Sequence, residues 1–421
     1  MGFCCSEAAW PTDSVHAACS PPAWSASAAS ALCGVAPTSG VLVGARALQG
    51  IFGALLSPSA LALLLAASPD GADRRRALAI WAGLLGLGAA TGLLAGGALV
   101  QLVDWRWIFL INLPVAALAL AAIPRVLEPD DLSARRSSPN VRGAALATMA
   151  LLLLVYTVVE TDSNAWTSAR TLGGLAVVIV LGIAFAVSER RSTSPLLPAE
   201  LLRRPLALRA DLVIFFAAAG LLAMFFFQTL YLQRVLGFSP LITGLSFLPF
   251  SGAMAIGSGL MGKLPQRVDP RLPITIGCGL AVVGLWLMSG LTPDSTYGAD
   301  VLPTLIITGF GLGLAFVPII GLGTGDAEER DGGLASGLMT TAQQIGGAIG
   351  IAALITIATD HTTNALHSGT SLASALTDGF QTAFHVEAGI IATAALLALI
   401  LLRRGQAAHG ALVGEIAMSS R

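Results

Sequence analysis

Charged residues are scarce in this chain of 421 residues. Asp, Glu, Lys and Arg together make up 11% of it, whereas hydrophobic residues make up 55%. A water-soluble domain carries about 25% charged residues, so this chain has too little polar surface to cover a globule in water. The net charge of −1 gives no electrostatic reason to expect a nucleic-acid partner. The composition instead indicates helices in contact with hydrocarbon.

Cysteine is also sparse, and its placement argues against two kinds of site. Four of the five cysteines lie within the first 33 residues, and the fifth is Cys278. The sequence contains no Cys-x-x-Cys pair and no Cys/His ligand spacing, so we expect neither a metal site nor a disulfide framework. It also contains no nucleophile elbow, phosphate-binding loop or pair of catalytic carboxylates. We therefore expect neither an enzyme nor a bound cofactor.

Long apolar segments recur at the length that a membrane-spanning helix needs, about 20 residues. Eleven are clear, and a weaker one near 23–37 is short and broken by proline. The clear segments lie near 41–66, 77–100, 106–127, 142–160, 171–188, 206–230, 242–262, 272–291, 302–323, 334–358 and 381–402. They lack the alternating pattern of a β-barrel strand, so we predict an all-α integral membrane protein.

The basic residues divide unequally between alternate loops. If the loop 67–76 is cytoplasmic, 18 Arg and Lys residues fall on that side and three fall on the other. Cytoplasmic loops are the ones enriched in Arg and Lys. We therefore predict a multi-pass protein of the cell membrane with both termini in the cytoplasm, provided that the weak first segment spans. If it does not span, the N-terminus lies outside.

Glycine spacing marks one helix as a packing element. Gly88, Gly92 and Gly96 are four residues apart and share a helix face, with Gly97 adjacent. Small residues on one face let a second helix approach closely in lipid. Generic packing and a functional contact both fit this pattern.

Several polar residues lie inside apolar segments. Arg46 is about 9 Å into its helix, where an arginine costs about 2.5–3.5 kcal/mol unless a partner, a wet cavity or the headgroups receive it. Gln228, Gln343 and Gln344 require hydrogen-bond partners there, which fits both packing and a cavity lining. His385 and Glu387 are titratable, but we expect both at the exposed outer end of the last helix.

The order and spacing of these features resemble the major facilitator superfamily, in particular its fourteen-helix drug:proton antiporter branch. Residues 46–50 (Arg-Ala-Leu-Gln-Gly) look like the fourth-helix motif of that branch, and residues 88–97 look like its antiporter motif. The stretches 105–114, 231–249 and 337–350 are also typical of it. The resemblance covers roughly residues 26–404.

Two departures accompany this resemblance. Leu93 stands where the antiporter motif has proline, which argues against coupling through that helix. The first two helices of the family, and the loop that follows them, have no counterpart in residues 1–40. The segment 23–37 then matches the third helix, so that twelve of fourteen helices remain.

The resemblance implies a bundle of about 12 transmembrane helices, in two pseudo-symmetric halves with two inserted helices. We divide the chain into an atypical N-terminus (1–22), an incomplete N-terminal bundle (23–127), an inserted helix pair with cytoplasmic linkers (128–205), a C-terminal six-helix bundle (206–402) and a cytoplasmic tail (403–421).

The resemblance also implies export of a small amphipathic organic molecule, driven by protons and working by alternating access. Arg46, Gln49 and Gly50 would serve proton coupling, Gly88 to Gly97 would form the moving contact, and Gln228, Gln343 and Gln344 are candidates to line the cavity.

Three alternatives stay open: an exporter of an endogenous metabolite, a truncated remnant that does not transport, and a membrane scaffold or sensor. Because of the missing helix pair, we expect little efflux from the 421-residue chain alone, and more from a form extended upstream by two helices.

Overall fold

The fold is described from a computed structural model, which covers residues 27–66, 68, 71–126, 140–160, 168–192, 205–263, 268–324 and 332–402. All regular structure within these ranges is helical. The predicted N-terminal region 1–22 and the tail 403–421 lie outside the described residues. The helices are α3 (Ser39–Ala66), α4 (Gly71–Leu102), α5 (Trp107–Leu110), α6 (Asn112–Val126), α7 (Val141–Val159), α8 (Ala169–Arg191), α10 (Pro205–Arg234), α11 (Pro240–Ser246), α12 (Leu248–Lys263), α13 (Arg271–Met288), a π-helical turn (Tyr297–Val301), α14 (Leu302–Thr324), α15 (Gly332–His367) and α16 (Leu372–Leu401).

The prediction of an all-α membrane protein is confirmed. Each of the eleven clear apolar segments coincides with a helix or with a consecutive helix pair. Seven helical stretches among the described residues are long and apolar enough to cross a membrane. Within the weaker segment at 23–37, the described residues 27–34 form a short helix. In hydrocarbon a helix satisfies its own backbone hydrogen bonds, which is why local hydropathy locates these elements.

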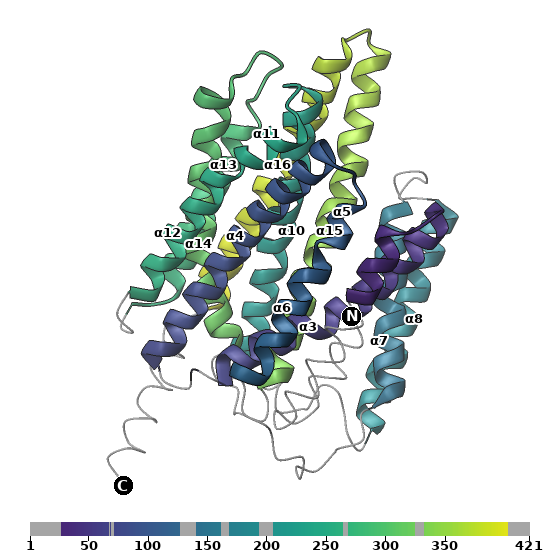
Figure 1. The fold of residues 1–421 in the computed structure, drawn as a ribbon, viewed down its shortest axis with the longest axis vertical. Coiled ribbons are helices and arrows are strands. Elements are labelled where there is room, and N and C mark those ends of the chain that lie inside the picture. The colour runs from purple at the N-terminus through teal and green to yellow at the C-terminus, as the bar shows by residue number, and fades with distance from the viewer. Residues whose placement is uncertain are drawn as a thin grey trace.

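The apolar core lies among the helices α10 to α16. The helix α14 packs against α12 and α13, while α10 packs against α15 and α16. Aromatic side chains fill the centre of this C-terminal bundle, among them Phe227, Phe250 and Phe316, each at most 1% exposed. Figure 1 shows these helices running roughly along the long axis of the molecule.

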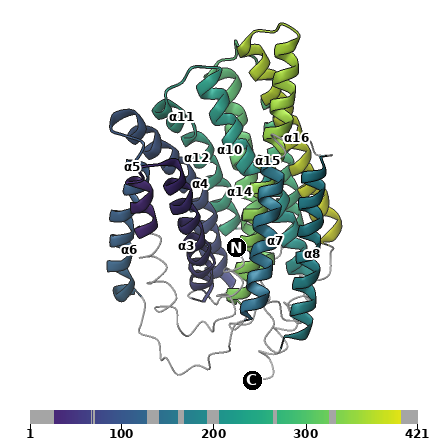
Figure 2. The same ribbon diagram turned by 90° about the vertical axis from the view of Figure 1, so that its right-hand side faces the viewer.

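The earlier helices pack onto this bundle at different places. The helix α4 lies against α11 and α12, and α3 contacts α15. The helices α7 and α8 pair with each other, and α7 also contacts α15. In Figures 1 and 2 this pair forms one edge of the molecule, and Figure 2 shows α6 at the opposite edge.

Candidate functional site

Among the described residues, the partners of Arg46 are polar and aromatic side chains and not acids. Its Nη1 donates a hydrogen bond to Oε1 of Gln49, one helical turn further on, at 2.8 Å. Nε2 of Gln49 in turn donates to Oγ of Ser30, at 2.5 Å. The guanidinium carbon lies 5.4 Å from the centre of the Phe109 ring, a cation–π distance. The structure thus brings Arg46 and Gln49 together, and joins α3 to the helix at 27–34 and to α5.

The helix α4 approaches the C-terminal bundle most closely at Gly97. A Cβ atom built there would lie 2.6 Å from the carbonyl carbon of Pro240 and 2.9 Å from the nitrogen of Leu241. Gly244 on α11 is its counterpart, because a Cβ there would lie 2.6 Å from Cα of Leu94. Two backbones are therefore in direct contact through paired glycines, as small residues permit in membrane helices.

The other predicted glycines have different surroundings. A Cβ atom at Gly88, Gly92, Gly96 or Gly50 would meet no atom within 4 Å among the described residues. A second close approach of α4 occurs instead at Gly83, where a Cβ would lie 3.2 Å from Oγ of Ser258. The face that touches α11 and α12 in this structure is therefore the one with Gly83 and Gly97. A moving contact through Gly88, Gly92 and Gly96 stays a prediction.

Two polar side chains are sealed inside the C-terminal bundle. Gln228 on α10 and Glu387 on α16 are both 0% exposed. No side-chain nitrogen or oxygen of either residue has a hydrogen-bond partner among the described residues. Their helices pack against each other, since a Cβ at Gly220 on α10 would lie 3.6 Å from the backbone oxygen of Glu387. Buried polar groups normally find a partner, so these exceptions require an explanation.

The expectation that Glu387 lies at an exposed helix end is wrong. Its helix begins at Leu372, nine residues before the predicted segment, so Glu387 is in the middle of the helix. Polar residues such as Ser374 and Asp378 lower the local hydropathy, so the predicted segment did not include the first turns of this helix. The sequence did contain a signal that Glu387 faces the core. Phe384, Glu387 and Ile391 share one helix face at i, i+3 and i+7. His385 does lie on an exposed face, where Nε2 is 3.0 Å from Oγ of Ser289.

The two glutamines of α15 differ from Gln228. Gln343 is half-buried and Gln344 is exposed. The neighbouring Gly346 and Gly350 pack directly on α10, where a Cβ at Gly350 would lie 2.6 Å from the oxygen of Ala219. A cavity-lining role for Gln343 and Gln344 stays a prediction.

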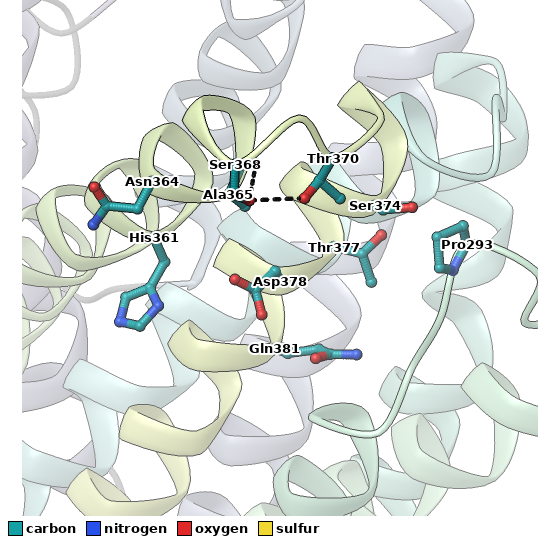
Figure 3. A pocket seen from close by; sticks show the side chains of 10 residues that line it. All are labelled: Pro293, His361, Asn364, Ala365, Ser368, Thr370, Ser374, Thr377, Asp378 and Gln381. Atoms are coloured by element: carbon teal, nitrogen blue, oxygen red, sulfur yellow. Dashed lines mark hydrogen bonds between the residues drawn. The ribbon is translucent and has the colours of Figure 1, made fainter.

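A polar pocket of about 570 Å³ lies where α15 ends and α16 begins. The loop charges predict that this end of the bundle faces away from the cytoplasm. Figure 3 shows His361 and Asn364 from α15 and Asp378 and Gln381 from α16 around it. Gln381 is anchored, because its Nε2 donates to the backbone oxygen of Leu291 at 2.6 Å. This pocket lies on a different face of α16 from Glu387.

Long apolar helices, glycine-mediated helix contacts and polar side chains inside the bundle together define a multi-pass membrane protein. Comparison with known proteins identifies its family: residues 22–351 match the Major Facilitator Superfamily. The chain belongs to this superfamily of membrane transporters.

Relatives within the family are similar over most of the chain. The chain is 36% identical to the puromycin resistance protein pur8 of Streptomyces alboniger, over 89% of this chain and 75% of that protein. It is 35% identical to the tetracenomycin C resistance and export protein of Streptomyces glaucescens, over 77% of this chain and 60% of that protein. The crystal structure of the human organic anion transporter MFSD10 has the same fold, with a TM-score of 0.60 at 15% identity, over 94% of this chain and 80% of that one.

Proposed function

We propose that this chain is a proton-coupled exporter of drug-like organic molecules that works by alternating access. The relatives that it resembles at 35–36% identity are named for resistance to puromycin and for resistance to, and export of, tetracenomycin C. Because the chain spans only 60–75% of their length, their activity supports the proposal for this chain and does not establish it.

The observation that carries proton coupling is the carboxyl group of Glu387. It lies at the middle of a membrane-spanning helix, is 0% exposed and has no hydrogen-bond partner among the described residues. A titratable group inside a membrane bundle is costly, which makes it a candidate for function. An ionised carboxylate there would have no compensating partner, so occlusion and ionisation oppose each other.

Because enclosure and ionisation of its carboxyl group exclude each other, Glu387 can couple proton binding to the transport cycle. The carboxyl group holds a proton while the bundle encloses it, and releases the proton when water reaches it from one side of the membrane. Gln228 lies on the helix packed against α16 and is equally buried. Its amide donates and accepts hydrogen bonds, so it would bind either a substrate polar group or an entering water molecule when the bundle opens.

Alternating access further requires two bodies that rock against each other. The contact of α4 with α11 and α12 provides a joint between the N-terminal helices and the C-terminal bundle, because backbone lies directly against backbone at Gly97 and Gly244. Arg46 would act within the N-terminal helices, where its charge is positioned by Gln49 and Phe109.

The test compares Glu387→Gln with Asp378→Asn, a matched carboxyl-to-amide change at an exposed position of the same helix. Both changes are made in the 421-residue chain and in the form extended upstream by two helices. In the form that transports, uncoupler-sensitive dye efflux from energised cells is expected to fall at least tenfold in the first variant and to stay unchanged in the second. Equal efflux in both variants would refute the coupling role. Sustained efflux in the presence of uncoupler would refute proton coupling altogether.

A second measurement does not depend on transport. It is useful because we expect little efflux from the 421-residue chain alone. An apolar carbodiimide adds to a protonated carboxyl group in an apolar site, and rearrangement leaves one N-acylurea per group. Peptide mass spectrometry should find this adduct on Glu387 and not on Asp378. An unmodified Glu387 would contradict a protonated, occluded carboxyl group.

A further inference from the structure

A second cavity lies between α4 and α12 at the opposite end of the bundle from the polar pocket. Its volume is about 570 Å³, within the range of roughly 300–1,000 Å³ that small-molecule sites occupy. One wall consists of Ile80, Leu84 and Leu87 of α4, and the other of Ala255, Gly259 and Gly262 of α12. Large apolar side chains therefore face a wall of small ones.

Packing explains why the cavity exists. The two helices run antiparallel and are in close contact at Gly83, beside Ser258 and Ala255. Around this contact the small side chains of α12 leave space that the α4 side chains do not fill, since Ile80 and Leu84 remain 55% and 57% exposed. A Cβ atom at Gly259 would likewise meet no atom within 4 Å among the described residues.

Two basic residues lie at one end of this cavity. Arg76 is in the second turn of α4, and Lys263 is the last residue of α12. Because the helices are antiparallel, both side chains are at the same end, and both line the cavity and are exposed. Neither makes an ion pair with any residue that the structure describes. Arg74, in contrast, donates to the backbone oxygen of Thr324 and anchors α4 to α14.

The loop charges predict that this end faces the cytoplasm, which puts Arg76 and Lys263 at the level of the inner-leaflet headgroups. Neither water nor a free anion would bury the apolar walls of the cavity. An anionic phospholipid matches both parts, because its phosphate meets the cations while an acyl chain covers the leucine side chains. Basic pockets between transmembrane helices on the cytoplasmic side are known to suit such headgroups.

We propose that the cleft between α4 and α12 is a binding site for one anionic phospholipid of the inner leaflet. The lipid would contact both the N-terminal helices and the C-terminal bundle, since α4 and α12 belong to different parts of the fold. Binding therefore stabilises the arrangement in which these two helices are in contact.

The test measures lipid binding to the purified full chain by native mass spectrometry. Phosphatidylglycerol is titrated against phosphatidylcholine, which has the same chains without net charge. The double variant Arg76→Gln/Lys263→Gln is expected to bind phosphatidylglycerol about 25-fold more weakly, because each basic group near the headgroups contributes about a fivefold factor. The matched control is Arg190→Gln/Arg191→Gln at the end of α8, which should bind as the unaltered chain does.

A second variant tests the apolar part of the cleft. Gly259→Phe fills the cleft and should abolish tight binding of phosphatidylglycerol, whereas Gly279→Phe, at an equally open position on α13, should not. The proposal is overturned if both charge variants bind alike, if phosphatidylcholine binds as tightly as phosphatidylglycerol, or if inorganic phosphate displaces the lipid. Retained binding in Gly259→Phe would likewise overturn it, because the lipid would then lie elsewhere.

Discussion

Replacing Gly97 by alanine would separate α4 from α11. The added methyl carbon would lie 2.6 Å from the carbonyl carbon of Pro240, while ordinary contact begins near 3.4 Å. The carbonyl oxygen of Pro240 lies nearer still, so the helices would have to separate locally by at least 3.4 − 2.6 = 0.8 Å. The obstacle is backbone and not the end of a flexible side chain, so it cannot rotate away. Overpacking of this kind costs about 1–3 kcal/mol.

Gly92→Ala is the matched control on the same helix. Both variants gain helix propensity, about 0.5–1 kcal/mol relative to glycine, but a Cβ at Gly92 meets no described atom within 4 Å. The difference between the two variants therefore isolates the contact with Pro240. We expect Gly97→Ala to be less stable than Gly92→Ala by about 1–3 kcal/mol.

The assay is unfolding of the purified full chain in detergent, followed by near-ultraviolet circular dichroism. Gly97→Ala should melt a few degrees below Gly92→Ala, and efflux should fall in the same order if α4 and α11 form the joint. Equal stability of the two variants would refute the close approach at Gly97. A lower stability of Gly92→Ala would instead favour the face that glycine spacing predicted.

Three further predictions concern polar residues and topology. Gln228→Leu should raise stability by about 1 kcal/mol or more while reducing efflux, because it removes unpaired buried atoms; a lower melting temperature would contradict this. Arg46→Leu should reduce uncoupler-sensitive efflux with a stability loss of at most about 1 kcal/mol, since exposed cation–π contacts are weak; Arg106→Leu, which removes a similar contact with an aromatic ring at 5.1 Å, should leave efflux intact. In a background without native cysteine, a Cys within 161–169 should react with an impermeant thiol reagent from outside and one within 132–138 should not; the reverse pattern would contradict the predicted topology.

Helix positions were predictable because, in a membrane, the hydropathy and length of each segment alone decide whether it forms a spanning helix. A segment such as 206–230 is long and apolar enough to span, and the helix found there is α10, from Pro205 to Arg234. The errors occurred where polar residues interrupt the hydropathy. The last helix begins at Leu372. The hydropathy window placed its start near 381, because the first turns carry serine, threonine and aspartate.

The surroundings of individual residues were less predictable. Glycine spacing favoured the face of Gly88, Gly92 and Gly96, with Gly97 adjacent, and the closest approaches of the α4 glycines to α11 and α12 are at Gly97 and Gly83. Spacing identifies a face that permits close approach, while the angle at which the partner helix crosses decides which glycine is used. Arg46 was predicted to require a partner, yet only the folded chain identifies that partner as Gln49, with Phe109 beside the guanidinium.

The sequence by itself determined that this protein is helical and membrane-embedded, because hydrophobic length and the loop charges act on each segment independently of the others. Tertiary structure alone decided which polar groups are enclosed and which helices leave space between them. Glu387 is sealed because three neighbouring helices, α10, α13 and α15, pack around α16. The cleft beside Arg76 and Lys263 exists because small residues of α12 happen to face large ones of α4. Both features depend on how helices distant in the chain meet, which no single segment encodes.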